Sequence, residues 1–167
     1  AALAAFAWGI STDVIAKATK AFEGLEHRLE ATRTVDNVLY VNDSFSTVPE
    51  TAIAAIESFA EPIILIAGGS EKGSDFTQLG VSIAAHNVRV LIAIGNMTSR
   101  IVDAATQAGY TGKIITDLSS MHDVVLAAKN EAKPGDVVLL SPACASFDMF
   151  KNYKERGRQF KHEVFLL

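Results

Sequence analysis

The only cysteine of the chain, Cys144, lies in the stretch SPACASFD, where a run of apolar residues ends. A catalytic thiol needs a neighbouring base or a lowered pKa. None of the four histidines falls in a loop expected at a strand end, and alanines flank Cys144 on both sides. The sequence therefore predicts an inert packing residue in a narrow loop, where Ser146 and the following backbone N–H groups face a ligand.

A second loop that could bind a ligand, AGGSEKGSDF, also follows an apolar run. Gly68 and Gly69 allow a ligand to approach the backbone closely, and Lys72 offers a point charge. The Walker A pattern G-x-x-x-x-G-K-[ST] is absent from the chain. Two interpretations stay open: a glycine-rich turn with a solvated lysine, or an anion site with Lys72 as its cation.

A third stretch, VNDSFSTVPE, places Asp43 and several hydroxyl side chains before a helix that Pro49 is expected to begin. Ser46 or Thr47 can cap this helix, and we expect such capping in part. A hydroxyl beside a helix N-terminus also favours a negatively charged ligand. The stretch is therefore a candidate for both roles.

Positioning these loops requires a regular scaffold, and the chain alternates between strand and helix patterns. A pair of helices is expected first, at 2–8 and 12–22, followed by a β-hairpin that begins at Leu29, turns at Asp36–Asn37 and continues through 38–41. The strands PIILIAGG, VRVLIAIG, GKIIT and DVVLLSPA then alternate with helices expected at 50–59, 77–86, 98–108, 119–131 and about 149–162. This order predicts an α/β fold, a Rossmann-like three-layer sandwich with a mostly parallel, roughly six-stranded sheet and an N-terminal β-hairpin.

Ligands of such a sheet bind beyond the carboxyl ends of its strands. The three loops above all lie at such ends, which makes them the candidate site. His27 and Arg28 precede the first strand, and we interpret them as either an ordinary surface pair or a contact to a ligand shared between domains. The basic residues of the last helix are expected to form a solvated face: Lys151, Lys154, Arg156, Arg158 and Lys161.

The composition restricts the class of protein. The chain has 167 residues, 49% of them hydrophobic, and a net charge of -4, which suits one compact domain and does not favour binding to nucleic acid. The single cysteine excludes an intrachain disulfide, and the cysteine count offers no zinc-type spacing. The apolar start AALAAFAWGIS is too short for a membrane span. We expect a cytoplasmic protein, and we interpret its start as the end of a helix from a larger protein.

Several motifs occur in order and carry a family resemblance: HRLE, NDSFSTVPE and LLSPACASFDMFKNYKERG, with LIAGGSEKGSDF between them. Together they resemble the C-terminal domain of the Mur ligases that add D-glutamate. The resemblance implies that residues 24–167 form this D-glutamate-binding domain. It also implies that residues 1–23 are a remnant of the family's central ATPase domain.

The resemblance further implies an activity for the full-length protein. The family's enzyme is a three-domain cytoplasmic ligase of peptidoglycan synthesis. ATP phosphorylates the carboxylate of UDP-MurNAc-L-alanine, and D-glutamate attacks the resulting acyl phosphate to form an amide. ATP and Mg²⁺ would be the cofactors, with Mg²⁺ bound outside this chain and UDP-MurNAc-L-alanine contacted through the missing domains. A monomer is expected, with no nucleic-acid or membrane partner.

Roles for individual residues follow from the resemblance by motif position. Those expected to bind D-glutamate are Thr47 and Lys72 at the α-carboxylate side, and Ser146, the Phe147 backbone and Tyr153 at the side-chain carboxylate. Those expected to face the nucleotide are Arg28 and Asp43, the latter at the ribose hydroxyls. No catalytic residue and no metal ligand is assigned to this chain, so its contribution would be positioning.

The chain departs from the family pattern in one loop. Many relatives read Asn-Asp-Ser-Lys-Ala-Thr-Asn, whereas this chain has Phe45 in place of the lysine and Val48 in place of the last asparagine. One cation near the reacting groups is thereby lost. Other Mur ligases and folylpolyglutamate synthetase carry different sequences at this loop, so the D-glutamate branch remains the best fit.

The main hypothesis is therefore the D-glutamate-binding domain of a ligase, inactive by itself because it lacks the P-loop and the UDP-binding domain. One alternative is a stand-alone Rossmann-like module that binds a small molecule without catalysis. A nucleotide-dependent oxidoreductase is weaker, since no G-x-G-x-x-G follows a strand.

Overall fold

The computed structural model describes residues 1–22, 24–70 and 73–167. Its centre is a six-stranded sheet with the order β1-β2-β6-β3-β4-β5. β1 and β2 form the antiparallel hairpin, and all other neighbouring strands are parallel. The bounds are β1 Glu30–Val35, β2 Val38–Asn42, β3 Ile63–Gly68, β4 Val88–Ile94, β5 Lys113–Ile115 and β6 Val137–Leu140. The predicted fold class is thus confirmed, including the hairpin.

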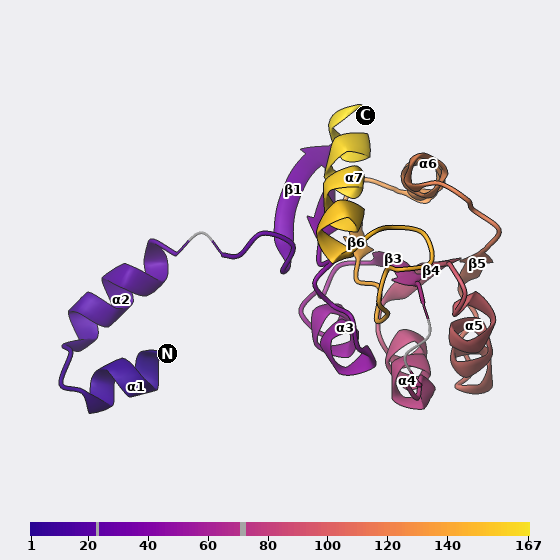
Figure 1. Cartoon of the computed structure of the whole chain (residues 1–167). Helices are drawn as coiled ribbons and strands as arrows, with labels where there is room; N and C mark the ends of the chain where they lie inside the picture. Colours follow the sequence, from indigo (N-terminus) through magenta and orange to yellow (C-terminus); the bar gives the residue numbers. More distant parts are fainter. Residues whose placement is uncertain (23, 71–72) are drawn as a thin grey trace.

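Helices cover both faces of this sheet (Figure 1). One face packs against α3, α4 and α5, and the opposite face packs against α6 and α7. The helices are α3 Pro49–Ile56, α4 Thr77–Ala85, α5 Thr98–Gln107, α6 Met121–Glu131 and α7 Tyr153–Phe165. The parallel order of the strands places the ends of β2, β3, β4 and β6 along the same edge, where the candidate loops begin.

The central strand β3 shows why this sequence makes two cores. Every residue of β3 is buried, so the strand reads as one apolar run. Ile63 and Leu65 pack on the side of α3–α5, while Ile64 and Ile66 pack on the side of α6 and α7. Each such side chain stabilises the fold by about 1.5–3 kcal/mol relative to an exposed one. The sheet is therefore a rigid base for the loops at its edge.

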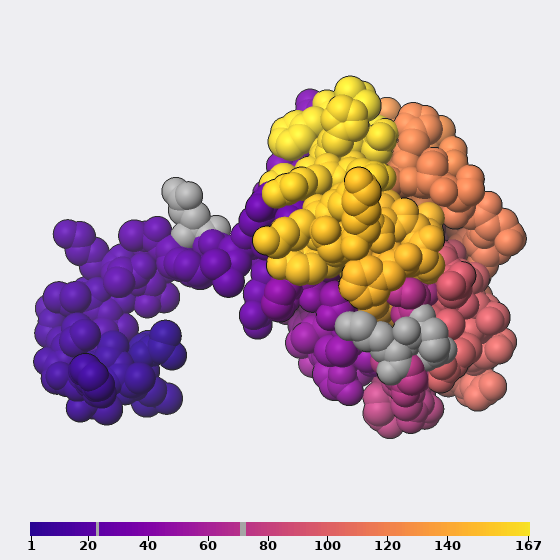
Figure 2. Space-filling model, viewed as in Figure 1, coloured from indigo at the N-terminus to yellow at the C-terminus, as the bar shows by residue number. Residues whose placement is uncertain are grey.

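The first two helices, α1 (Ala2–Ala7) and α2 (Thr12–Lys20), bury none of their residues. Trp8 is 90% exposed, and Leu3, Phe6 and Val14 are also exposed. The pair stands apart from the body of the molecule (Figures 1 and 2). That residues 1–23 belong to a separate ATPase domain stays a prediction.

Some predicted helix boundaries were wrong. The last helix begins at Tyr153 and not at about 149, because Asn152 is its N-cap and its side chain accepts a hydrogen bond from the Glu155 N–H. That helix also continues past 162 to Phe165. The second and third helices end at Lys20 and Ile56, earlier than the predicted 22 and 59. In the part of the chain that the structure describes, no helix is long and apolar enough to cross a membrane.

Candidate functional site at the carboxyl edge of the sheet

The loops that follow β3 and β6 are joined at the carboxyl edge by hydrogen bonds. The Ser70 N–H donates to the Ala145 oxygen at 2.9 Å, and the Phe147 N–H donates to the Ser70 hydroxyl at 3.1 Å. Gly69 has a φ of +146°, and a Cβ there would lie 2.1 Å from the Ala145 oxygen. Only glycine fits this crossing. The sequence order of these loops gave no hint that they would be bonded to each other.

The loop after β2 is tied to the first turn of α7. The Ser44 hydroxyl donates to the Tyr153 oxygen at 2.8 Å. The rings of Phe45 and Tyr153 meet edge to face, with centroids 5.3 Å apart and an interplanar angle of 82°. Thr47 lies two residues after Phe45 in the same loop, and it is half-buried, as Tyr153 is. The structure thus brings these predicted D-glutamate residues to one end of the sheet.

Two other predicted D-glutamate residues, Ser146 and Phe147, lie in the loop after β6. Ser146 is buried, whereas the Phe147 side chain is 71% exposed. The Phe147 backbone is held by the hydrogen bond from its N–H to the Ser70 hydroxyl, and its role in binding D-glutamate stays a prediction. Lys72, the fifth predicted contact, lies outside the described residues.

The prediction that Arg156 lies on a solvated face was wrong. Its side chain is fully buried, with 0% exposed. The guanidinium donates to the Ser44 hydroxyl and to the Ser44 oxygen at 3.0 Å each, and to the oxygens of Cys144 and Ala145 at 3.1 and 3.4 Å. Burial lowers the pKa of Arg156 to about 10, so the side chain still carries its charge at neutral pH. Charge periodicity could not reveal this, because Lys154 and Arg158 beside it are exposed as expected.

The predicted nucleotide residues meet at a small cavity of about 160 Å³. Arg28 and Asp43 line it, together with Phe45, Ser46 and Thr51 among others. Arg28 is exposed, and its guanidinium carbon lies 6.0 Å from the centre of the Phe45 ring. The cavity is therefore bordered by a cation, an anion, an aromatic ring and hydroxyl groups.

Asp43 is only 4% exposed and is held on both oxygens. Oδ1 accepts from the Leu29 N–H at 3.1 Å, and Oδ2 accepts from the Ser141 hydroxyl at 2.7 Å. Burial raises the pKa of the Asp43 carboxyl above its usual value, and these hydrogen bonds oppose the shift. Each carboxylate oxygen has a second lone pair, so a further donor such as a hydroxyl can still be accepted.

His27 was missed as a structural residue, because the pair His27–Arg28 was interpreted as a surface or ligand pair. His27 is 2% exposed, and its Nδ1 lies 2.9 Å from the Asn42 Nδ2. A Cβ on Gly157 would lie 2.4 Å from that ring, so α7 needs a glycine there. Burial lowers the pKa of His27, which favours the neutral ring. Its oxygen accepts from the Phe45 N–H at 2.9 Å, so His27 supports the loop after β2.

Capping of α3 by Ser46 or Thr47 was a wrong expectation. The N-cap residue is Val48, which makes no side-chain cap. The Ser46 hydroxyl instead donates to Thr51 Oγ1 at 2.7 Å, and Thr51 donates to the Val48 oxygen at 2.8 Å. The hydroxyl of Thr47 is therefore not used for capping, which keeps it available for a ligand.

Cys144 is 3% exposed and belongs to the core on the side of α3–α5. This burial confirms its predicted packing role. Across residues 1–22, 24–70 and 73–167, no group of three or more His, Cys, Asp or Glu residues could hold a metal ion.

The family model described as "Mur ligase, glutamate ligase domain" matches residues 27–144. The chain therefore belongs to the Mur ligase family. The matched region includes Arg28, Asp43, Thr47 and Lys72 and ends before Ser146.

Curated relatives extend the similarity to both ends. The chain is 45% identical over its whole length to the UDP-N-acetylmuramoylalanine–D-glutamate ligase of Pelotomaculum thermopropionicum, of which it covers 36%. It is 43% identical over 98% of its length to the ligase of the same name from Salinibacter ruber, of which it covers 35%. The chain thus spans about a third of the length of these relatives.

Solved structures share the fold at much lower identity. The UDP-N-acetylmuramate-alanine ligase MurC of Thermotoga maritima has a TM-score of 0.66 at 13% identity, covering 98% of this chain and 36% of its own. The MurF ligase of the same organism, solved with ADP, has a TM-score of 0.62 at 16% identity, with the same shares covered. These likenesses show the fold alone.

Proposed function

We propose that this chain is the D-glutamate-binding part of an ATP-dependent ligase that joins D-glutamate to UDP-MurNAc-L-alanine in peptidoglycan synthesis. Relatives that match 96–100% of the chain carry that ligase name. Since the chain spans about a third of them, the ATPase and UDP-binding parts would be supplied by the rest of the protein. This chain would not catalyse ligation alone.

One observation of the structure supports this proposal most directly. Thr47, Ser146, the Phe147 backbone and Tyr153 come from three separate segments, yet contacts through Ser44, Ser70 and Arg156 join those segments at one edge of the sheet. Hydroxyl groups and a nearby buried cation suit a dianionic amino acid.

The nucleotide side fits the same proposal. ATP supplies the phosphoryl group that activates the carboxylate of the acceptor substrate. Arg28 is exposed beside the cavity and can contact an anionic phosphate, while Asp43 can accept hydrogen bonds from ribose hydroxyls. Mg²⁺ would be bound by the other domains.

The contribution of these residues would be positioning. A nucleophilic amine must approach an activated carbonyl at a fixed distance and direction, and such orientation accounts for a large share of the rate in reactions of this kind. Thr47 and Lys72 at one carboxylate, with Ser146, Phe147 and Tyr153 at the other, would fix both ends of D-glutamate. The amine between them would then have one orientation.

The direct test is a chimaera in which this chain replaces the matching segment of the Pelotomaculum ligase. Release of ADP should depend on D-glutamate and should be much weaker with L-glutamate. Lys72→Ala should raise the KM for D-glutamate by roughly ten- to a hundredfold, because one charge-assisted contact is worth about 1.5–3 kcal/mol. The KM for UDP-MurNAc-L-alanine should hardly change. Equal effects on both substrates would contradict the assignment of Lys72.

Cys144 supplies a control for this assay. Cys144→Ala should keep most of the activity, since the side chain packs in the core and takes no part in the reaction. A thousandfold loss of kcat with an intact fold would instead identify a reactive thiol.

A titration of this chain by NMR separates the proposal from its alternative. D-glutamate should shift amides near Thr47 and Ser146 only at millimolar concentration, because a small ligand makes few contacts and the other domains complete the site. Micromolar binding by this chain alone would favour a self-sufficient binding module.

A further inference from the structure

The guanidinium of Arg156 is a buried cation whose partners are dipoles. The acceptors that the described residues offer to it are uncharged: the Ser44 hydroxyl and the backbone oxygens of Ser44, Cys144 and Ala145. Transfer of a charge from water into the interior is unfavourable unless it is fully hydrogen-bonded. A leucine or methionine could fill the same volume without that penalty, so packing alone does not explain an arginine here.

The hydrogen bonds of Arg156 link two segments that are about a hundred positions apart in the sequence. Ser44 belongs to the loop after β2, whereas Cys144 and Ala145 belong to the loop after β6. The Ala145 oxygen also accepts from the Ser70 N–H, so the loop after β3 joins the same cluster. The fork of an arginine side chain can bridge several oxygens in fixed directions, which a lysine cannot do.

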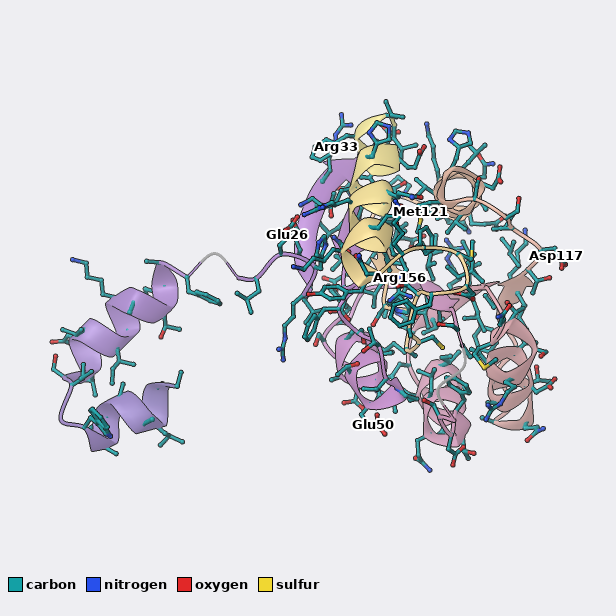
Figure 3. The ribbon with its side chains drawn as sticks, in the orientation of Figure 1. Glu26, Arg33, Glu50, Asp117, Met121 and Arg156 are labelled. Atoms are coloured by element: carbon teal, nitrogen blue, oxygen red, sulfur yellow. The ribbon has the colours of Figure 1, made fainter. Side chains whose placement is uncertain are left out.

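The position of Arg156 in α7 adds a fourth connection. Figure 3 shows it at the N-terminal end of α7, beside the loop that follows β6. The Ser44 hydroxyl that accepts from Arg156 Nε donates in turn to the Tyr153 oxygen. Rotation or withdrawal of the guanidinium would therefore disturb Ser44, Tyr153 and the Ala145–Ser146 segment together.

We propose that Arg156 is a positioning residue for the amino-acid substrate. Its guanidinium sets the spacing between the loops that carry Thr47 and Ser146. Its positive charge, which is bonded directly to uncharged oxygens and is only attracted at longer range by Asp148, favours a dianionic ligand at that edge. This inference rests on the proposed D-glutamate function. Arg156 acts through these loops and does not itself contact the reacting atoms.

The test uses Arg156→Ala in the ligase that contains this chain. The KM for D-glutamate should rise on the order of ten- to a hundredfold, and the KM for ATP should change less than about twofold. Millimolar guanidinium ion should restore part of the D-glutamate affinity, because it can occupy the vacated volume and donate to the same oxygens. Urea, which has a similar shape and no charge, should not restore it.

Further variants separate the effect of the Arg156 charge from that of its forked shape, and they provide a control in case Arg156→Ala does not fold. Arg156→Lys keeps the charge and loses the fork, so it should lie between the wild type and Arg156→Ala. Arg158→Ala removes an exposed arginine two positions further along α7 and should leave both KM values unchanged. If Arg156→Ala does not fold, the split between the two KM values is measured on Arg156→Lys.

Several outcomes would overturn the proposal. One is a lower melting temperature with an unchanged KM for D-glutamate. Another is an equal rise of the KM for ATP and for D-glutamate. A third is equal rescue by urea and guanidinium. Each would leave Arg156 with a structural role only.

The result remains interpretable if the wild-type enzyme does not use D-glutamate. That outcome rejects the proposed function and, with it, the substrate role of Arg156. The loop-spacing role is then read from NMR spectra of this chain: Arg156→Ala should shift the amides of 44–47 and 145–147 and leave those of β4 in place, with partial reversal by guanidinium. Unshifted loop amides would reject the spacing role as well.

Discussion

The carboxyl edge has two sides: the one proposed to bind the amino acid, called the amino-acid side, and the one proposed to bind the nucleotide, called the nucleotide side. Buried charges of opposite sign hold the loops on these two sides. On the amino-acid side a buried cation, Arg156, is surrounded by oxygens of hydroxyl and carbonyl groups. On the nucleotide side a buried anion, Asp43, is surrounded by the Leu29 N–H and the Ser141 hydroxyl. Among the described residues, neither charge forms a direct ion pair, and Asp148 near Arg156 and Arg28 near Asp43 act only through longer-range attraction. Dipoles satisfy the hydrogen bonds of each group while leaving its field to act on a ligand.

The signs of these charges match the ligands proposed for each side. A dianionic amino acid favours the side with the cation, and hydroxyl donors of a ribose favour the side with the anion. One edge of a sheet can thus present two distinct electrostatic environments when buried charges of opposite sign hold different parts of the same two loops. The experiments below test whether the two sides are independent.

The largest expected effect comes from Gly69→Ala, which breaks the crossing of the loops after β3 and β6. The added Cβ would lie 2.1 Å from the Ala145 oxygen, in a backbone region unfavourable for alanine. The free energy of unfolding should fall by roughly 3 kcal/mol or more. Chemical denaturation of this chain measures it.

Gly109→Ala is the matched control for Gly69→Ala. Gly109 also has a positive φ, +88°, but nothing lies within 4 Å of its Cβ position. Its substitution should lower the free energy of unfolding by about 1 kcal/mol, from backbone strain alone. Equal losses at the two positions would show that the crossing is not tightly packed.

The next effect concerns Asp43→Asn on the nucleotide side. The substitution keeps the size of the side chain and removes its charge. The KM for ATP should rise by about tenfold or more, since a hydrogen bond to a charged group is worth about 1.5–3 kcal/mol. The KM for D-glutamate should change little. A comparable rise in both values would show that the two sides are coupled.

The pH dependence of stability tests the raised pKa of Asp43 independently. Because burial raises its pKa in the folded protein above the usual 3.8, the folded state holds this proton more tightly than the unfolded chain does. The contribution of Asp43 to the free energy of unfolding should therefore decrease as the pH rises from about 3.8 through the higher folded pKa. Over that window the wild type should lose stability relative to Asp43→Asn; an opposite slope would contradict a raised pKa.

A smaller effect is expected at Phe45, whose ring lies between the two sides. It contacts Tyr153 on the amino-acid side and Arg28 on the nucleotide side. Phe45→Ala should raise both KM values by only a few fold, because such aromatic and cation–π contacts are worth about 0.5–1.5 kcal/mol each. Val81→Ala, at an exposed apolar residue of α4, should change neither value. A change in one KM alone would mean that Phe45 serves one side only.

The smallest effect lies away from both sides, on the pair formed by His122 and Glu163. His122 Nδ1 lies 2.9 Å from the Glu163 carboxylate, and this hydrogen bond raises the pKa of His122. The pair stabilises the fold fully below pH 6.5, the usual pKa of histidine, and its contribution is lost as the pH rises through the higher folded pKa. Melting temperatures of the wild type and His122→Ala should differ slightly at pH 5.5 and coincide at pH 9. A difference that persists at pH 9 would rule out protonation as its cause.

Sequence alone determined the fold class and the placement of the candidate loops at one edge of the sheet, whereas the order of the strands came from the structure. Runs such as PIILIAGG and VRVLIAIG have no alternation, which identifies strands buried on both faces. Their alternation with helices fixes a parallel sheet and places the loops of Asp43, Lys72 and Ser146 at one edge. The motifs in those loops were specific enough to predict the family, since their residues and their order can be read directly from the chain.

Only the tertiary structure decided which polar side chains are buried. Arg156 and His27 stand in segments whose composition is that of a solvated surface, and nothing in their neighbours separates them from Arg158 or Arg28. Burial of a charge depends on whether oxygens from distant segments converge on it, as Ser44, Cys144 and Ala145 converge on Arg156. The same holds for Ser46, which bonds to Thr51 because the loop folds back on α3. Convergence of this kind is a property of long-range contacts, so periodicity and local motifs do not encode it in a readable form.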